Sequence, residues 1–279
     1  MPARRPPRYS AVLLYPFVRG ESAMVAALTD DQWREFGSTL RDVHASTVGG
    51  RLRGRLPVET FSLPSAALIL RLMRLVHEIR FGGAAARLAE FWREHAGQIC
   101  WMLARAEALG SLLRTRPFEY VRYHADIHAA NILVGDDGRL HLIDWGGPLI
   151  APRERDLLYV VGSKISRAVE PREEEELFFE GYGPAEIDPE TLIYYRYERI
   201  IEDLGEFGKS VFLDPSLDNR AREEKAELAT SFFAPDGMVE LAETVTPSSA
   251  GGRPPSQARR PGRRQGGSTF TNAASAPPG

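Results

Sequence analysis

A β-hairpin in the middle of the chain is the feature that most limits what this sequence can fold into. Residues 131–135 (NILVG) and 139–145 (RLHLIDW) are short apolar runs, and Asp136-Asp137-Gly138 joins them. An Asp-Gly turn between two such runs is a strong hairpin signal. Just before the hairpin, residues 119–124 (EYVRYH) predict one further strand.

Helical periodicity surrounds this hairpin on both sides. Thr29 and Gln32 fit a capping box, and Trp33 and Phe36 follow at helical spacing. These residues predict a helix over about 30–46. Further helices are predicted over about 65–80, 84–114, 154–166, 172–181, 189–210 and 218–233, and a strand that ends in a turn is predicted in 10–20. His95 lies on the apolar stripe of the 84–114 helix, so we expect it to pack in the core. The predicted class is α+β, mostly helical.

Both ends of the chain have a different composition from its body. From Val245 onward the chain has five arginines, no acidic residue and many Gly and Pro, so the body is more acidic than the whole-chain net charge of −3. Such a segment buries too little apolar surface to offset its ordering entropy. We expect a basic disordered start at 1–12, a globular domain at 13–244 and a disordered Arg/Pro/Gly-rich tail at 245–279. The arginines come without aromatic or helical patterning, so no nucleic-acid partner is expected.

Composition also limits the compartment and the chemistry. No stretch approaches 18 uninterrupted apolar residues, and the basic, proline-rich start MPARRPPRYS lacks the apolar region of a secretory signal. We therefore expect a cytoplasmic protein without a membrane partner. The single cysteine, Cys100, excludes an intramolecular disulfide and a cysteine-built zinc site.

The polar residues before and after the hairpin suggest a phosphoryl-transfer site. His124, Asp126 and Asn131 stand as H-x-D-x-x-x-x-N, and Asp144 follows Asn131 by 13 residues, at the end of the second hairpin strand. Transfer from ATP requires a carboxylate that orients the attacking hydroxyl, and oxygen ligands that hold Mg²⁺ on the phosphates. The Asp-x-x-x-x-Asn interval is that of protein kinase catalytic loops, where a further Asp binds the metal.

Two other interpretations of these residues remain open at this point. The alternation H-x-D-x-H of His124, Asp126 and His128 suits a zinc hydrolase, although the other histidines of the chain form no clustered pair. Asp126 and Asn131 can also simply cap a turn, as such residues often do.

Two long stretches extend the likeness beyond the kinase pattern. YHADIHAANILV (123–134) and LIDWGGPLIAPRERDLLYV (142–160) closely resemble the aminoglycoside phosphotransferase and choline kinase family, in particular its spectinomycin phosphotransferase-like branch. LLYPFVRG, TDDQWREFGSTLRDVHA, AEFWREHAGQI and YYRYERIIEDLGEF resemble the same branch, so the likeness covers about residues 10–243. It implies a protein-kinase-like fold and an ATP-dependent small-molecule kinase whose acceptor is an alcohol group, with a role in antibiotic resistance.

The resemblance also implies roles for individual residues near the hairpin. Asp126 would be the catalytic base, and His124 would brace the catalytic loop. Asn131 and Asp144 would bind Mg²⁺ and, through it, ATP. Asp156 would support the loop structurally.

The resemblance also implies two groups of residues that would contact adenine and the acceptor. Tyr15 and Phe17 lie where the family's hinge between lobes meets adenine. Glu198, Glu202 and Asp203 lie on the helical run YYRYERIIEDLGEF, where acidic side chains would attract a small, cationic, aminocyclitol-like acceptor.

A kinase-like enzyme also uses a phosphate-covering loop and a strand lysine. The lysines of this chain are Lys164, Lys209 and Lys225, all in predicted helices, and residues 1–12 contain neither lysine nor glycine. We therefore expect the hinge and mainly the helical C-terminal lobe, with the N-terminal lobe largely absent. Two functions stay open: an active phosphotransferase, or a truncated, catalytically impaired remnant that acts at most as a small-molecule binding module.

Overall fold

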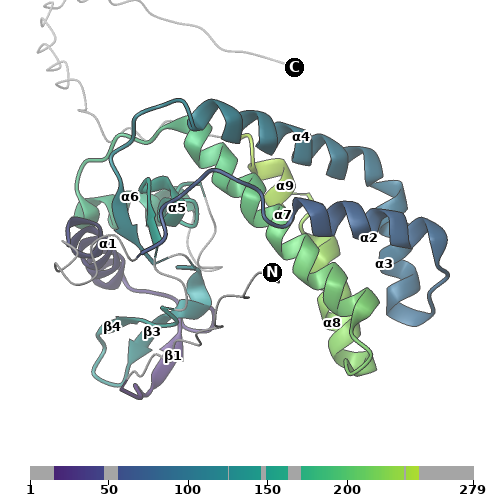
Figure 1. The fold of residues 1–279 in the computed structure, drawn as a ribbon. Helices are drawn as coiled ribbons and strands as arrows, with labels where there is room; N and C mark the ends of the chain where they lie inside the picture. Colours follow the sequence, from purple (N-terminus) through teal and green to yellow (C-terminus); the bar gives the residue numbers. More distant parts are fainter. Residues whose placement is uncertain are drawn as a thin grey trace, which may run out of the picture.

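The computed structural model describes residues 16–46, 56–124, 126–145, 149–162, 171–235 and 237–244. The predicted start at 1–12, Tyr15, Lys164 and the predicted tail at 245–279 lie outside the described residues. The described chain forms a helical body beside a mixed region of short strands and helices, and one long helix, α7 (Pro189–Leu213), runs between the two (Figure 1).

The predicted hairpin is confirmed. β3 (Ile132–Gly135) pairs antiparallel with β4 (Leu140–Leu142), and β1 (Gly20–Ser22) adds to the other edge of β3. β2 (Val121–Tyr123) lies within the predicted 119–124 strand and pairs with β5 (Leu149–Ala151), which was not predicted. The strand predicted over 10–20 is wrong for its described part: residues 16–19 are not in a strand, and β1 begins at Gly20.

The helices follow most of the predicted ranges. They are α1 (Asp30–Ala45), α2 (Ala66–Glu78), α3 (Gly83–Glu94), α4 (Ala96–Leu113), α5 (Glu154–Leu157), α6 (Pro171–Tyr182), α7, α8 (Asn219–Ser231) and α9 (Met238–Leu241). The capping box of α1 is confirmed, because the Thr29 hydroxyl accepts from the Gln32 N–H while the Gln32 side chain accepts from the Thr29 N–H. The helix predicted over 154–166 is short, since α5 ends at Leu157, and residues 163–170 lie outside the described part. α9 was not predicted.

One long helix was predicted over 84–114, and this is wrong. The chain turns at His95 between α3 and α4, which run in different directions (Figure 1). The His95 ring stacks on Phe91 with centroids 4.0 Å apart and also contacts Phe233. Its Nδ1 lies 2.9 Å from the Phe91 carbonyl oxygen, so the side chain takes part in ending the first helix. His95 thus packs against other rings, as expected, but it is half-buried and lies at the edge of the core rather than in it.

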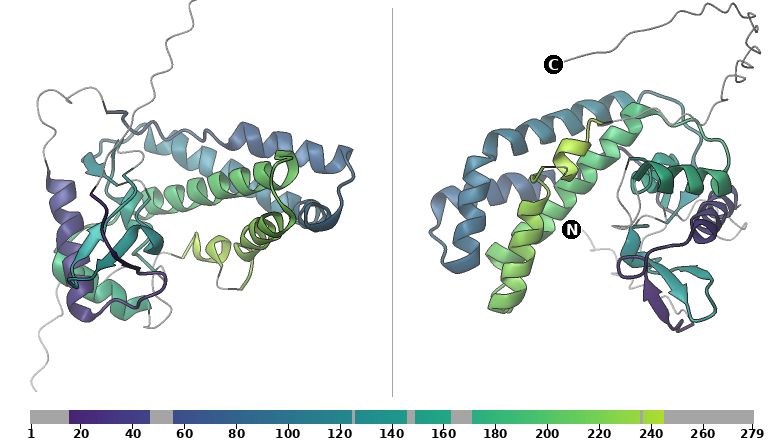
Figure 2. Two further views of the ribbon diagram at one scale, coloured as in Figure 1. Left: turned by 90° about the horizontal axis from the view of Figure 1, so that it is seen from below. Right: turned by 180° about the vertical axis from the view of Figure 1, so that it is seen from behind.

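The core gathers around α7. Tyr194, Tyr195 and Leu204 of this helix are fully buried, and so is Trp92 of α3, which lies close to Gly208 of α7. Figure 2 shows α7 enclosed between α4 and α2 on one side and α8 on the other. The tight packing fixes the position of α7, which carries residues of the site described below.

Two helices of the mixed region approach each other very closely. A Cβ atom on Gly37 of α1 would lie 2.0 Å from the Phe178 carbonyl oxygen, and one on Gly181 of α6 would lie 1.9 Å from the Arg34 carbonyl oxygen. Only glycine permits such an approach of two backbones. The two helices are therefore packed tightly against each other, and α1 also contacts β2.

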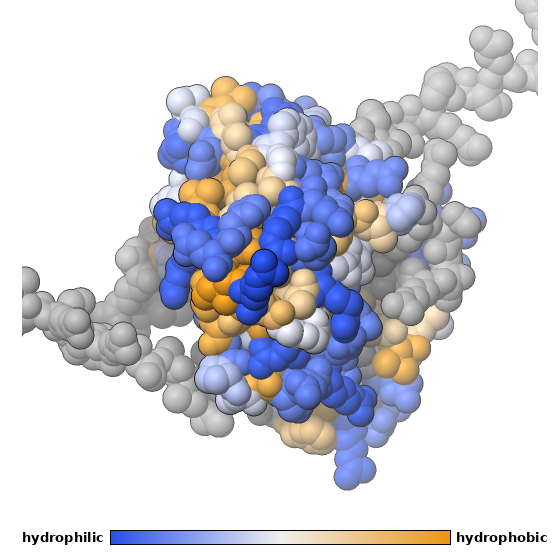
Figure 3. Space-filling view, turned by 90° about the vertical axis from the view of Figure 1, so that its right-hand side faces the viewer, coloured by the Kyte–Doolittle hydropathy of each residue, from blue (hydrophilic) through white to orange (hydrophobic). Residues whose placement is uncertain are grey.

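Polar side chains cover much of the molecular face seen from the right of Figure 1, with apolar residues among them (Figure 3). Within the ranges that the structure describes, no helix combines the length and apolarity that crossing a membrane requires.

Candidate active site

The loop between β2 and β3 carries three of the predicted site residues, and its conformation is fixed locally. A 3-10 turn, η1 (Ala129–Asn131), ends the loop, and His128 caps it because its Nδ1 accepts a hydrogen bond from the Ala130 N–H at 3.2 Å. Because the Nδ1 atom accepts this bond, Nε2 of a neutral His128 ring carries the proton. His128 thus has a structural hydrogen bond, as expected.

His124 is fully buried and connects the loop to the hairpin. Its Nε2–H donates to the Ile143 carbonyl oxygen at 2.8 Å, and its Nδ1 accepts from the Asp126 N–H at 3.4 Å. Burial lowers the pKa of the His124 imidazole, which favours the neutral ring that this arrangement requires. The Trp145 ring covers His124 with centroids 4.4 Å apart.

Asp156 of α5 supports the loop from behind. Its Oδ2 accepts from the His124 backbone N–H at 2.8 Å and from His44 Nε2–H at 3.1 Å. The Tyr182 hydroxyl donates to His44 Nδ1 at 2.7 Å, so α1 and α6 both contribute to this buried chain of contacts. His44 was not predicted to take part, although its place one turn after Leu40 on the apolar stripe of α1 indicated a buried histidine.

The Asp126 carboxylate has three neighbours with polar hydrogens. Its Oδ1 accepts from Arg199 Nη1 at 2.7 Å and from the Tyr159 hydroxyl at 3.1 Å, and its Oδ2 lies 3.4 Å from His128 Nε2. Burial raises the pKa of Asp126, but the hydrogen bonds and charges of His128, Arg199 and Tyr159 outweigh burial and lower its pKa to about 2. Asp126 is therefore ionised at neutral pH, and about a third of its side chain is exposed.

Asn131 and Asp144 lie at the same end of the hairpin. The Ile143 N–H donates to the Asn131 carbonyl oxygen at 3.0 Å, which extends the β3–β4 pairing by one step and puts Asp144 directly beyond it. The Asn131 amide nitrogen donates to the Asp126 backbone oxygen at 2.7 Å, so the amide oxygen is the atom left for another partner. Asp144 is exposed and has a φ of 63°, a left-handed conformation that turns the chain sharply after β4.

The donor set of Asn131 and Asp144 suits magnesium. A neutral amide oxygen and a carboxylate are both hard oxygen ligands, which Mg²⁺ prefers together with phosphate oxygens. No group of three His, Cys, Asp or Glu side chains able to hold a metal is found within the described ranges, which removes support for the zinc-hydrolase interpretation of His124, Asp126 and His128.

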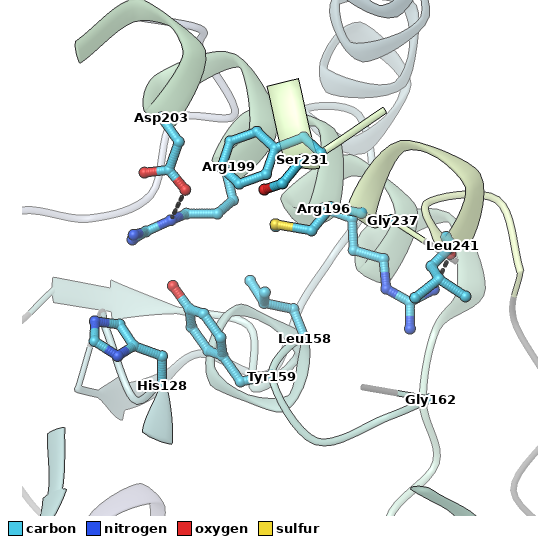
Figure 4. A pocket seen from close by; sticks show the side chains of 12 residues that line it. His128, Leu158, Tyr159, Gly162, Arg196, Arg199, Asp203, Ser231, Gly237 and Leu241 are labelled. Carbon is cyan, nitrogen blue, oxygen red and sulfur yellow. Dashed lines mark hydrogen bonds and ion pairs between the residues drawn. The ribbon is translucent and has the colours of Figure 1, made fainter. Parts of the chain in front are cut away.

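A pocket of about 420 Å³ opens beside the Asp126 carboxylate. His128, Tyr159 and Arg199, the three neighbours of Asp126, all line it, and Asp203 stands above Arg199 (Figure 4). The rest of the pocket wall is mostly apolar, and much of it comes from residues near the end of the described chain. Its residues are Leu158, Gly162, Arg196, Ser231, Phe232, Gly237, Met238 and Leu241. The pocket therefore joins a polar end at Asp126 to an apolar interior.

Arg196 holds this wall together. It is buried, and its guanidinium donates to the Leu241 and Thr244 carbonyl oxygens at 3.0 and 2.9 Å and to the carbonyl oxygen of Val161. It thereby ties the segment after α9 to the segment after α5.

The three acidic residues predicted to meet a substrate lie in different surroundings. Asp203 lines the pocket beside Asp126. Glu198 is partly buried and its carboxylate accepts from Arg155 Nη1 at 2.6 Å, while Glu198 and Glu202 both line a separate hollow of about 30 Å³. The structure thus brings Asp203 to Asp126 but not Glu198 or Glu202.

Phe17, the described member of the predicted adenine pair, is 89% exposed, and Tyr15 lies outside the described part. Arg199 and Tyr159 were missed by the sequence reasoning. Tyr159 follows Asp156 by three residues, and Arg199 precedes Asp203 by one helical turn, so both stood in segments already singled out.

Comparison with known proteins gives two concordant results. Residues 6–192 match the phosphotransferase enzyme family. Among solved structures, spectinomycin phosphotransferase in complex with ADP and spectinomycin is 31% identical to this chain, with a TM-score of 0.72, over 82% of this chain and 69% of that one. An AMP-bound complex of spectinomycin phosphotransferase is 30% identical, with a TM-score of 0.71, over 82% of this chain and 70% of that one.

No match was found among curated proteins. The family match and the structural similarity agree with the motifs around Asp126 and Asp144, and they confirm the resemblance inferred from the sequence. We conclude that this chain belongs to the phosphotransferase enzyme family.

Proposed function

We propose that this protein transfers the γ-phosphoryl group of ATP to a hydroxyl of a small, cationic, aminocyclitol-like molecule. The observation that carries the proposal is the grouping of Asp126, Asn131 and Asp144 at one end of the β3–β4 hairpin, beside a pocket of about 420 Å³. The complex of the related phosphotransferase with ADP and spectinomycin supports a nucleotide and an aminocyclitol as the two ligands.

Asn131 and Asp144 would hold Mg²⁺ through the amide oxygen and the carboxylate. When bound, the ion would neutralise charge on the phosphates and orient them. Asn131 is held for this role by its own amide nitrogen, which donates to the Asp126 backbone. The same bond couples the metal site to the loop that carries the catalytic carboxylate.

Asp126 would orient the acceptor hydroxyl. Its pKa of about 2 makes it a weak base, so its main contribution is to fix the direction of the attacking oxygen, and proton transfer follows as the new bond forms. His124 and Asp156 would act through Asp126 by holding its loop against α5.

Acceptor and nucleotide would approach Asp126 from different sides. We assign the acceptor to the pocket, where Asp203 adds negative charge. Contact of the acceptor with Glu198 and Glu202 stays a prediction. Adenine contact through Tyr15 and Phe17 likewise stays a prediction, as does the assignment of 13–244 to the hinge and helical C-terminal lobe of a kinase-like fold.

A binding role without turnover is the second candidate. Its support is the placement of the described lysines, because Lys209 pairs with Glu206 on α7 and Lys225 lies on α8 over the Phe207 ring. Neither of these two lysines belongs to a strand, where kinase-like enzymes carry the lysine that contacts the phosphates.

One experiment separates the two candidates. The full chain is incubated with ATP, Mg²⁺ and spectinomycin or related aminocyclitols, and ADP release is measured beside calorimetric binding. Phosphotransferase activity predicts ADP release that falls by about 10²–10⁴-fold in Asp126→Asn. The control is Asp136→Asn, an exposed carboxylate in the hairpin turn. Binding without ADP release would favour the second candidate, and ADP release that survives Asp126→Asn would contradict the assigned role.

A further inference from the structure

The Arg199 guanidinium reaches the Asp126 carboxylate from α7 and is held there by several contacts. Its Nη1 donates to Asp126 Oδ1 at 2.7 Å, and its Nε donates to Asp203 Oδ2 at 2.8 Å. Its central carbon lies 5.9 Å from the centre of the Tyr159 ring. Because α7 is itself packed in the core, with Leu204 fully buried, the guanidinium has a fixed place beside Asp126.

Part of this guanidinium remains available to a further partner. Arginine carries five N–H donors, and the two contacts use one at Nε and one at Nη1. Among the residues that the structure describes, none accepts a hydrogen bond from Nη2, and the side chain lines the pocket with 22% of its surface exposed. Arg196, which also lines the pocket, instead donates to three backbone carbonyl oxygens. In Figure 4 the guanidinium end of Arg199 lies on the side of His128 and the Tyr159 hydroxyl, away from Arg196.

The contacts of Asp126 limit where a phosphoryl group would stand during transfer. Oδ1 accepts from both Arg199 and Tyr159, so Oδ2 is the oxygen that can meet the acceptor hydroxyl. A hydrogen bond brings the hydroxyl oxygen to about 2.7 Å from Oδ2, and the phosphorus atom must approach that oxygen to about 3–3.5 Å. The group in transfer therefore stands within about 6 Å of the same carboxylate that Arg199 contacts.

Like charges would come together at this point. The Asp126 carboxylate is ionised at neutral pH, and a phosphoryl group in transfer spreads negative charge over three oxygens. Repulsion between such charges grows as water is excluded. On the hairpin side, Asn131 and Asp144 would hold the Mg²⁺ that neutralises the phosphates. On the pocket side, the Arg199 guanidinium can offset the repulsion, because it carries a permanent charge and contacts Asp126.

We propose that Arg199 is a catalytic residue, which donates from Nη2 to the phosphoryl group during transfer while Nη1 and Nε hold Asp126 and Asp203. The inference rests on the proposed function, because it adds a residue to the same reaction. In that reaction the acceptor oxygen forms a bond to the γ-phosphorus, and the bond from this phosphorus to the β–γ bridging oxygen breaks. ADP leaves, and the hydroxyl proton passes to Asp126 and from there to water. Arg199 keeps its proton throughout and stabilises charge on the phosphoryl oxygens.

Steady-state kinetics of the full chain with ATP, Mg²⁺ and spectinomycin give the first measurement. Arg199→Gln should lower kcat by about 10³-fold and leave KM for ATP within about threefold, because the contact to the phosphoryl group forms during transfer. Arg199→Lys keeps the charge without the planar fork and should fall between the two. The matched control is Arg220→Gln, an exposed arginine of α8, which should keep the activity of the unmodified protein.

A transition-state analogue separates this role from mere positioning of Asp126. Aluminium fluoride with ADP and Mg²⁺ takes the place of the phosphoryl group, and it should tighten ADP binding by about 10²-fold or more in the unmodified protein. Arg199→Gln should lose most of this gain, and its unchanged affinity for ADP without fluoride would show that the variant is folded. Asp126→Asn should keep the gain, because it removes a negative charge beside the analogue. Calorimetric titration of ADP with and without aluminium fluoride measures all three proteins.

Two outcomes would overturn the catalytic role of Arg199 alone. One is ADP release in Arg199→Gln equal to that in Arg220→Gln, in a protein that Asp126→Asn inactivates. The other is an equal loss of the fluoride-dependent gain in Arg199→Gln and Asp126→Asn, since Arg199 would then act only through Asp126. An unmodified protein that neither releases nor binds ADP would instead contradict the proposed function, and this inference with it.

Discussion

The Asp156 carboxylate accepts a hydrogen bond from the His124 backbone N–H at 2.8 Å, across 32 residues of sequence. Both residues are fully buried, and the bond fixes the start of the loop that carries Asp126. The Asp156 carboxylate lies behind the loop, rather than in the pocket, and so helps to fix the position of the Asp126 carboxylate.

Replacing Asp156 by Asn should destabilise the protein. An amide can still accept from the His124 N–H, but it is a weaker acceptor and loses the charge that His44 Nε2–H contacts. We expect a loss of about 1–3 kcal/mol in the free energy of unfolding, measured by urea denaturation. Asp136→Asn is the control at an exposed position and should change stability by less than about 0.5 kcal/mol. Equal stability of the two variants would contradict the supporting role of Asp156.

The close crossing of α1 and α6 makes a second prediction about stability. Gly37→Ala and Gly181→Ala each place a methyl group about 2 Å from a backbone carbonyl oxygen, so the helices must separate. We expect each variant to lose about 1–3 kcal/mol or more, the usual range for overpacking. Gly97→Ala on α4 is the matched control, because no atom lies within 4 Å of the added carbon, and alanine should stabilise that helix by up to about 1 kcal/mol. Thermal denaturation of the three variants measures the contrast, and a stable Gly37→Ala protein would refute the tight crossing.

Local features of the fold could be predicted because neighbouring residues determine them. The Asp-Gly turn of the hairpin and the capping box at Thr29 act within a few residues, and both appear as expected. The helix end at His95 was missed, and there the side chain combines a local contact with the Phe91 carbonyl oxygen and a tertiary contact with Phe233, far along the chain. Helical periodicity alone continues through this position.

The candidate site was predictable only in part for the same reason. Asp126, Asn131 and Asp144 are close in sequence, and the hairpin register brings them together. Arg199 meets Asp126 across 73 residues, and this pairing depends on the tertiary placement of α7 relative to the loop. The sequence marked the acidic residues of α7 as a group but did not show that Asp203, and not Glu198, faces Asp126.

Because Asp144 has a left-handed backbone conformation, two substitutions can distinguish its effect on stability from its proposed role as a Mg²⁺ ligand. Asn tolerates a positive φ as Asp does, whereas Ala does so at a cost of about 1–2 kcal/mol. Asp144→Asn should therefore keep its stability but require a higher Mg²⁺ concentration for half-maximal nucleotide binding, since a charged ligand is lost. Asp144→Ala should lose both. Urea denaturation and calorimetric titration of ATP at several Mg²⁺ concentrations measure the two effects, and an unchanged Mg²⁺ requirement in Asp144→Asn would argue against Asp144 as a ligand.

The neutral, buried His124 predicts how stability depends on pH. Burial lowers the pKa of His124 in the folded protein below its usual value of 6.5, so the unfolded chain binds a proton first as the pH falls. Stability is therefore fully present above pH 6.5 and is lost as the pH falls from there toward the folded pKa, by at most about 1.4 kcal/mol per pH unit from this group.

A variant comparison isolates this contribution of His124 from the other titrating groups. His124→Gln should be less stable than the unmodified protein at pH 8, because the histidine ring no longer bridges the Ile143 carbonyl oxygen and the Asp126 N–H. Its free energy of unfolding should nevertheless fall less steeply between pH 6.5 and 5, because the titrating ring is gone. His77→Gln, at an exposed position of α2, should keep the original slope. Urea denaturation across this range measures all three slopes, and the same slope in His124→Gln as in His77→Gln would show that His124 is protonated as readily in the folded protein as in the unfolded chain.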